Sequence, residues 1–298
     1  MLRFFACFLF LFVVKAQAQN CDNVKSGLDA QTRPQNASRD IVGQDLDEIR
    51  QRGWISFAVY EDFAPYSYEE KGALKGVDID LGHLIAKDLG LEARFIETQA
   101  DENVDGDLRN NVWKGKVIGG QVANVMLHVP YDHELACRNE LVVFTGQYFN
   151  EKIAIAYRES RYPEKGPIPA YFRYDTVGVE NDSLSDFYLS GIGNGQITPN
   201  MTRYRTTGEA MQALARDEVM AVMGPLGELE FGLSDEEKVH IPPLPGLAKA
   251  QWTLGIAVRH NWRSLAYAVD DIVRAAVQDG RMKSIFAAHG LTYTAPDW

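Results

Sequence analysis

The stretch FAPYSYEEKGALKGVDIDL, residues 63–81, carries the pattern that decides the fold. Before it, residues 55–60 (ISFAVY) alternate as a β-strand does, and the Phe-Ala-Pro-Tyr sequence ends that strand in a loop. Behind it, Asp78 or Asp80 can cap a helix that runs as far as Gly90. The apolar side chains of this helix recur at helical spacing, at Leu81, Leu84, Ile85 and Leu89. The stretch therefore predicts a strand, a loop and a helix in succession.

Strands and helices continue to alternate along the rest of the chain. A first group of strands is predicted over residues 93–97, 122–129, 142–144 and 152–157. A proline-rich loop then opens a second unit, with strands over 176–179, 219–223, 241–244 and 254–258 and helices over 184–189 and 208–216. Two helices, 264–279 and 282–289, close the chain. The polar, glycine-bearing residues 101–120 predict a long loop with one short helix at most.

Two motifs give this order a likeness to a known family. Residues 63–66 followed by 75–81 are similar to the aromatic-x-Pro-aromatic loop and Gly-Phe-Asp-x-Asp-Leu helix start of the periplasmic solute-binding proteins of the polar amino-acid type. Residues 279–285 (DGRMKSI) resemble the C-terminal helix break of that family. The resemblance runs from about Gly53 to the C-terminus and implies an α/β, two-lobed periplasmic binding protein of type II, with a cleft between the lobes. We assign residues 48–150 and 260–298 to lobe 1 and 151–259 to lobe 2.

Three further segments resemble a narrower group. These are residues 107–115 (DLRNNVWKG), 125–130 (VMLHVP) and 178–189 (GVENDSLSDFYL). They look like the binding-protein relatives encoded with periplasmic quinoprotein alcohol dehydrogenases, the MxaJ/XoxJ type of methanol-oxidation proteins. This likeness implies a role in assembling or activating a pyrroloquinoline-quinone (PQQ) dehydrogenase. Trp113 then becomes a candidate partner contact, since an exposed tryptophan is a good interface anchor.

The family resemblance also implies ligand-binding residues. In amino-acid receptors a first-loop aromatic stacks on the ligand, an arginine clamps its carboxylate and a hydroxyl at a helix N-terminus adds a hydrogen bond. Phe63, Arg138 and Ser183 stand at these positions, with Arg138 six residues before the FTGQY segment 144–148. Each also has a plain alternative: local packing for Phe63, a surface ion pair for Arg138 and an ordinary helix cap for Ser183.

The chain departs from the receptor pattern at two places. Amino-acid receptors carry a carboxylate for the ammonium group just after the strand predicted over 219–223, where this chain has Gly224 and Pro225. Glu228 is the nearest acid, and a turn would have to bring it into the cleft. Small hydroxyl residues expected after the 122–127 strand are replaced by a segment that includes His128 and Tyr131, which we take as cleft candidates. Standard amino-acid recognition is therefore not expected.

Catalytic motifs are missing from the sequence. The segment with His128, Asp132, His133, Glu134 and Cys137 invites a metal or thiol interpretation, but His133-Glu134 lacks the second histidine of a zinc helix. Neither a Gly-x-Ser-x-Gly elbow nor a phosphate-binding glycine loop occurs. We expect no enzyme activity, no metal and no cofactor.

The N-terminus predicts export. Arg3 precedes an apolar run over residues 4–14 and a small-x-small signal at 16–18, which together form a secretory signal peptide cleaved near Ala18. We expect a periplasmic protein with an N-terminal arm over 19–47 and no membrane span after cleavage. Cys21 and Cys137 would then remain, either joined in a disulfide or as two unlinked thiols.

Charge limits the partners. The 298 residues include 30 basic and 41 acidic side chains, a net charge of −11 that signal removal would lower to −13. Such a chain is not drawn to nucleic acid. Two functions stay open: an accessory factor of a PQQ-dependent dehydrogenase that binds a partner protein or small ligand, and an extracytoplasmic receptor that delivers a carboxylate-bearing solute, an amino or organic acid, to an ABC transporter.

Overall fold

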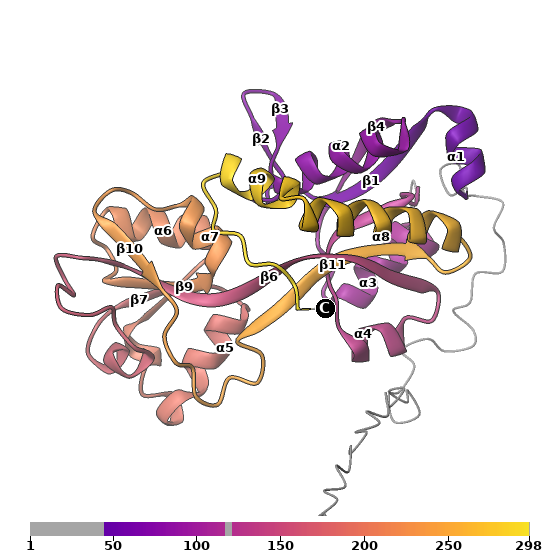
Figure 1. Cartoon of the computed structure of the whole chain (residues 1–298). Helices are drawn as coiled ribbons and strands as arrows, with labels where there is room; N and C mark the ends of the chain where they lie inside the picture. Colours follow the sequence, from indigo (N-terminus) through magenta and orange to yellow (C-terminus); the bar gives the residue numbers. More distant parts are fainter. Residues whose placement is uncertain (1–44, 117–120, 298) are drawn as a thin grey trace, which may run out of the picture.

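The computed structural model describes residues 45–116 and 121–297, so the predicted signal peptide and Cys21 lie outside the described residues. Two α/β lobes lie side by side, as the family resemblance implied, and one mixed sheet runs through both of them (Figure 1). The strand order of this sheet is β4-β1-β5-β11-β6-β9-β7-β8, with β10 paired to β6. None of the helices in the described ranges combines the length and apolar character needed to cross a bilayer.

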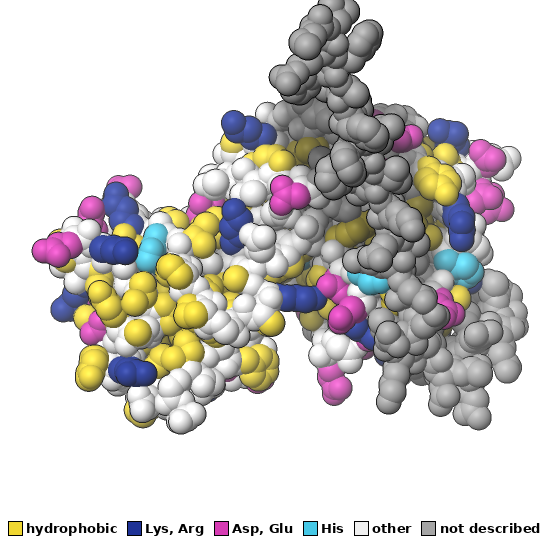
Figure 2. Space-filling view, turned by 60° about the horizontal axis from the view of Figure 1, so that its bottom comes forward, with side chains coloured by type: hydrophobic (Ala, Val, Ile, Leu, Met, Phe, Trp, Pro, Cys, Tyr) yellow, Lys and Arg dark blue, Asp and Glu magenta, His cyan; other side chains and the backbone are white. Residues whose placement is uncertain are grey.

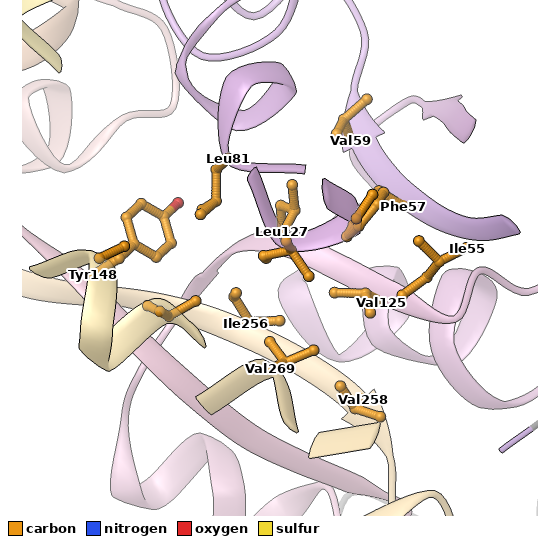
Figure 3. Packing of buried hydrophobic residues seen from close by; sticks show 14 of the residues in the cluster. Ile55, Phe57, Val59, Leu81, Val125, Leu127, Tyr148, Ile256, Val258 and Val269 are labelled. Atoms are coloured by element: carbon orange, nitrogen blue, oxygen red, sulfur yellow. The ribbon is translucent and has the colours of Figure 1, made fainter. Parts of the chain in front are cut away.

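The first lobe is built on parallel strands β1 (Trp54–Tyr60), β4 (Glu92–Thr98) and β5 (Val125–Pro130). Helices α2 (Val77–Leu89), α8 (Arg263–Gln278) and α9 (Arg281–Ala288) pack against it, and α1 (Leu46–Arg52) precedes it. A short hairpin, β2 (Tyr68–Glu70) and β3 (Ala73–Lys75), lies in the loop before α2. Figure 3 shows the buried aliphatic and aromatic side chains of β1, β5 and β11 meeting those of α2 and α8.

Helix α2 begins differently from the prediction. Its N-cap is Gly76, at φ 128°, where a Cβ atom would collide with the carbonyl of Tyr66. Neither Asp78 nor Asp80 caps the helix; both lie within its first turn, and Asp78 is fully buried. A glycine at this position lets the Phe-Ala-Pro-Tyr loop pack directly on the helix start.

Residues 101–116 are more ordered than predicted. Helix α3 (Val104–Leu108) is followed by a π-helical turn at Arg109–Trp113 and then, after the gap at 117–120, by β5. Trp113 is only 2% exposed and packs with Leu108, Met126 and Leu135 in the lobe-1 core. The expectation of an exposed partner contact at Trp113 is therefore wrong, because the turn directs the indole inward.

One long strand joins the lobes. The sequence predicted two strands over 142–144 and 152–157, but they form a single strand, β6 (Val142–Arg158), that runs through both lobes (Figure 1). The return strand β11 (Gln251–Arg259) pairs antiparallel with it from Lys152 to Val142. Residues Leu254–Val258 of β11 also pair with β5, so the return strand is shared with the first lobe's sheet.

The second lobe contains β7 (Val177–Glu180), β8 (Met201–Tyr204), β9 (Ala221–Pro225) and β10 (Glu237–His240). Its helices are α5 (Leu184–Gly191), α6 (Thr207–Ala215) and α7 (Leu226–Phe231). Strand β10 lies earlier than the predicted 241–244, since the following residues are a proline-containing loop that leads to β11. Helix α4 (His133–Arg138) returns the chain from β5 to β6 in lobe 1.

Candidate functional site

His128 lies where the two lobes meet and has an unusual backbone. Its φ is 57°, a left-handed value that is uncommon outside glycine. The pairing of β5 with β11 is irregular at this point, between Gly255 and Ala257, as in a β-bulge. Bulges turn a side chain away from the regular alternation of a strand. The imidazole of His128 accordingly lies at the lobe junction.

The ring of His128 is enclosed by aromatic side chains. It meets Phe63 edge-on at a centroid distance of 4.8 Å and Tyr66 at 4.2 Å. Its Nδ1 lies 3.3 Å from Oδ2 of the buried Asp78. The structure thus places Phe63 and His128 in contact with each other, and the ring contacts of Phe63 match the local packing considered as its alternative.

A chain of buried hydrogen bonds extends from this cluster. The hydroxyl of Tyr148 donates to Asp78 Oδ1 at 3.2 Å, next to the irregular part of β6 that includes Gly146 at φ 55°. Burial, reinforced by the neighbouring Asp78 charge, raises the pKa of Tyr148 well above its usual range. Tyr148 is therefore a permanent hydrogen-bond donor at this position.

Tyr66 and Glu151 connect the lobes directly. The Tyr66 hydroxyl, from the first loop of lobe 1, donates to Oε2 of Glu151 on β6. The backbone N–H of Gly227, in α7 of lobe 2, points to Oε1 of the same carboxylate at 3.5 Å. Burial raises the pKa of Glu151, although the Tyr66 hydrogen bond opposes that rise. A Cβ atom at Gly227 would collide with the Tyr66 hydroxyl, so the two lobes approach closely here.

Further acids lie beside this contact on the lobe-2 side. Glu180, at the end of β7, accepts hydrogen bonds from the backbone N–H and the hydroxyl of Thr207 at 2.9 and 2.8 Å. Burial and the charge of Glu180 raise the pKa of Glu228 to about 8. Because α7 starts directly after β9, one helical turn brings Glu228 close to Glu180 and Glu151. From the sequence alone, Glu228 is recognisable only as the acid nearest to the end of the predicted 219–223 strand.

Arg138 and Ser183 both have structural partners. Arg138 Nε lies 3.3 Å from Asp105 Oδ2 in α3, and Asn139 donates to the other oxygen of that carboxylate at 2.6 Å. Ser183 is the N-cap of α5, where its hydroxyl accepts from the N–H of Asp186 at 3.2 Å. These contacts match the plain alternatives considered for the two residues.

A pocket of about 460 Å³ lies between the lobes. Lobe 1 contributes Tyr131 and Asp132, α5 of lobe 2 contributes Leu184, and Lys249 and Trp252 come from the loop before β11 and from β11 itself. Pro130, Gln251 and Thr253 complete the lining. The Lys249 ammonium lies 2.5 Å from Asp132 Oδ2. Of the predicted cleft residues, Tyr131 is the one that lines this pocket, and a pocket of this size accommodates a small molecule.

The sequence also raised a disulfide and a metal site at the segment that contains His133 and Cys137. Cys137 is disulfide-bonded, and the other two cysteines of the chain, Cys7 and Cys21, lie outside the described residues. Cys137 Sγ also lies 3.5 Å from His133 Nε2. Within residues 45–116 and 121–297, no three His, Cys, Asp or Glu side chains converge in a way that could hold a metal ion.

The model of the bacterial extracellular solute-binding proteins, family 3, matches residues 55–112, which include the first loop and α2. No curated protein sequence matches the chain significantly. Solved structures match over most of its length.

An ancestral cationic amino-acid solute-binding protein covers 82% of this chain and 99% of its own, with TM-score 0.67 and 20% identity. The fold is that of a two-lobed periplasmic binding protein. An amino-acid ABC transporter substrate-binding protein from Streptococcus pneumoniae, bound to L-arginine, covers 84% and 100% with TM-score 0.59 and 20% identity. A solute receptor for L-cysteine of Neisseria gonorrhoeae covers 83% and 93% with TM-score 0.58 and 19% identity.

Proposed function

We propose that this protein is an extracytoplasmic, non-catalytic binding protein that serves a PQQ-dependent alcohol dehydrogenase as an accessory factor. The observation that carries the proposal concerns the residues expected to bind an amino acid: two of them are engaged in other contacts, and the expected acid is missing from its position. Arg138 is paired with Asp105, Ser183 caps its own helix, and the strand end that would supply an ammonium-binding acid is Gly224-Pro225. Together with the three segments that resemble the MxaJ/XoxJ type, this favours a partner-binding role over amino-acid capture.

Lobe 2 offers a surface for such a partner. Hydrophobic side chains gather on the face of lobe 2 seen in Figure 2. On α5, Phe187 is 64% exposed and lines a groove of about 600 Å³ together with Leu184, Ile192 and Leu247. Exposed apolar patches on exported proteins often mark protein contacts. The groove around Phe187 replaces the buried Trp113 as the candidate interface.

The proposal is tested by affinity purification of the tagged protein from the periplasm of its native host. We expect a quinoprotein dehydrogenase to co-purify and its specific activity to fall in a deletion strain. Phe187→Ser should weaken the association at least tenfold, whereas Tyr267→Ser, an equally exposed aromatic on lobe 1, should leave it unchanged. Recovery of no dehydrogenase, with normal dehydrogenase activity in the deletion strain, would refute the role.

A second candidate is the receptor of an ABC transporter for a small solute. It is favoured by the pocket between the lobes and by the solute-binding proteins that share the fold. A deletion strain that loses uptake of one solute while keeping full dehydrogenase activity would favour this candidate. The same experiment therefore separates the two roles.

A further inference from the structure

The pocket between the lobes contains one acid and one base, and they differ in how firmly they are held. Asp132 is fixed: it is the N-cap of α4, and its Oδ1 accepts from the N–H of Leu135 at 2.9 Å. Its Oδ2 holds the Lys249 ammonium at 2.5 Å. Burial opposes the charge of Asp132, but the hydrogen bonds from Lys249 and Leu135 outweigh it and lower its pKa. Asp132 is thus a preorganised carboxylate.

Lys249 is held much less firmly. It belongs to the irregular segment between β10 and β11, and its side chain is 59% exposed, against 28% for Asp132. An exposed ion pair of this kind contributes little free energy. The ammonium of Lys249 can therefore move into water at small cost, whereas Asp132 keeps its helix cap and stays in the pocket.

The walls of the pocket are apolar and partly aromatic. Tyr131 is held in place because its N–H donates to the carbonyl of Thr253 at 2.7 Å and its ring lies over Gly255, where a Cβ atom would come within 3.0 Å of the ring. Trp252 on β11 and Leu184 on α5 provide the other apolar walls. Aromatic faces attract cations, most strongly in the case of tryptophan.

We propose that this pocket binds a small organic cation with an apolar body, whose ammonium group replaces that of Lys249 on the Asp132 carboxylate. Lys249 occupies the position of the ligand's charged group and acts as an internal competitor. An organic anion would instead have to sit against Asp132, which cannot withdraw, and would be repelled by it. The net charge of −11 also raises the local concentration of cations.

Three probes of similar shape test whether the pocket prefers a cation, whichever partner the protein serves. These are 2-phenylethylammonium, 2-phenylethanol and 3-phenylpropanoate, titrated into the full mature protein by isothermal calorimetry. We expect the ammonium probe to bind at least tenfold more tightly than the alcohol and the acid. Equal binding of all three, tighter binding of the acid, or binding of none of them to the wild type and to Lys249→Ala would overturn the proposal.

Two variants address the assigned groups. Lys249→Ala removes the competitor and should tighten binding of the ammonium probe at least fivefold, while Lys238→Ala, an exposed lysine paired with Glu159 in lobe 2, should not change it. Asp132→Asn keeps a helix-capping side chain and should weaken binding more than tenfold. A weaker affinity in Lys249→Ala, or an unchanged affinity in Asp132→Asn with an unchanged melting temperature, would contradict the assignment.

Discussion

The raised pKa of Glu228 makes a specific prediction about stability and pH. Burial and the neighbouring Glu180 charge raise this pKa from 4.5 to about 8 in the folded protein. Below pH 4.5 the carboxyl is protonated in both folded and unfolded chains. Between about pH 4.5 and 8 the unfolded chain loses the proton while the folded protein retains it, so the stability of the folded state falls as the pH rises.

Glu228→Gln tests this prediction, because glutamine resembles the protonated acid and does not titrate. The full pKa difference corresponds to a ceiling of about 5 kcal/mol. Since Glu228 is half-buried by surface area, we expect solvent to reduce the effect to about 1–3 kcal/mol. The free energy of unfolding of the variant should equal that of the wild type at pH 4.5 and exceed it increasingly as the pH rises to 8. Above pH 8 the difference should stay constant.

Urea unfolding of the mature protein at pH values from 4.5 to 9 measures the effect. Glu164→Gln, in an exposed loop of lobe 2, is the matched control and should show no pH-dependent difference from the wild type. A difference between Glu228→Gln and the wild type that is constant over this range, or that shrinks with rising pH, would refute the reasoning about the acidic junction.

Three other changes test separate contacts. Gly227→Ala should lower the free energy of unfolding by about 1–3 kcal/mol, because the added Cβ atom collides with the Tyr66 hydroxyl. In a double-mutant cycle measured by urea unfolding, Tyr66→Phe should recover part of that loss, and additive effects of the two substitutions would count against the contact. Trp113→Ala should lower the unfolding free energy by about 3–5 kcal/mol as a buried core residue, whereas an effect below 1 kcal/mol by the same assay would contradict its burial. Cys137→Ser should lower the free energy of unfolding by about 2–5 kcal/mol, because it removes a disulfide. We propose Cys21 as the partner of Cys137, and peptide mapping that finds no Cys21–Cys137 link would exclude that pairing.

Local sequence patterns predicted the elements of the fold well but failed at irregularities of the sheet. The strand, loop and helix over residues 55–89 occur as expected, and so do β7, α5, α6 and β9 of lobe 2, but β8 and α7 were not predicted. The sequence predicts two strands in place of β6, because Gly146 and the polar residues around it interrupt the apolar pattern. In the structure these residues form an irregular stretch of a continuous strand, which a two-residue period cannot reveal.

The site was harder to predict, because its acids are recognisable only by their surroundings in three dimensions. Asp78 has the position of a helix cap in sequence, yet it is buried against Tyr148. Glu151 lies between Asn150 and Lys152 in a polar part of β6, so the local pattern does not predict its burial. Arg138 has the spacing of a ligand clamp, but Asp105, more than thirty residues earlier, pairs with it, and spacing alone cannot predict such a contact.

Strand β6 has a further consequence for how this molecule can be divided. Val142–Arg158 supplies a strand to each half of the sheet, and β11 accompanies it, so neither lobe has a complete sheet without the other. A fragment cut at the lobe boundary would expose unpaired strand edges. The lobes are therefore not modules that can be exchanged with those of another protein of this fold, and substitutions in one half have to remain compatible with a backbone that the other half also uses.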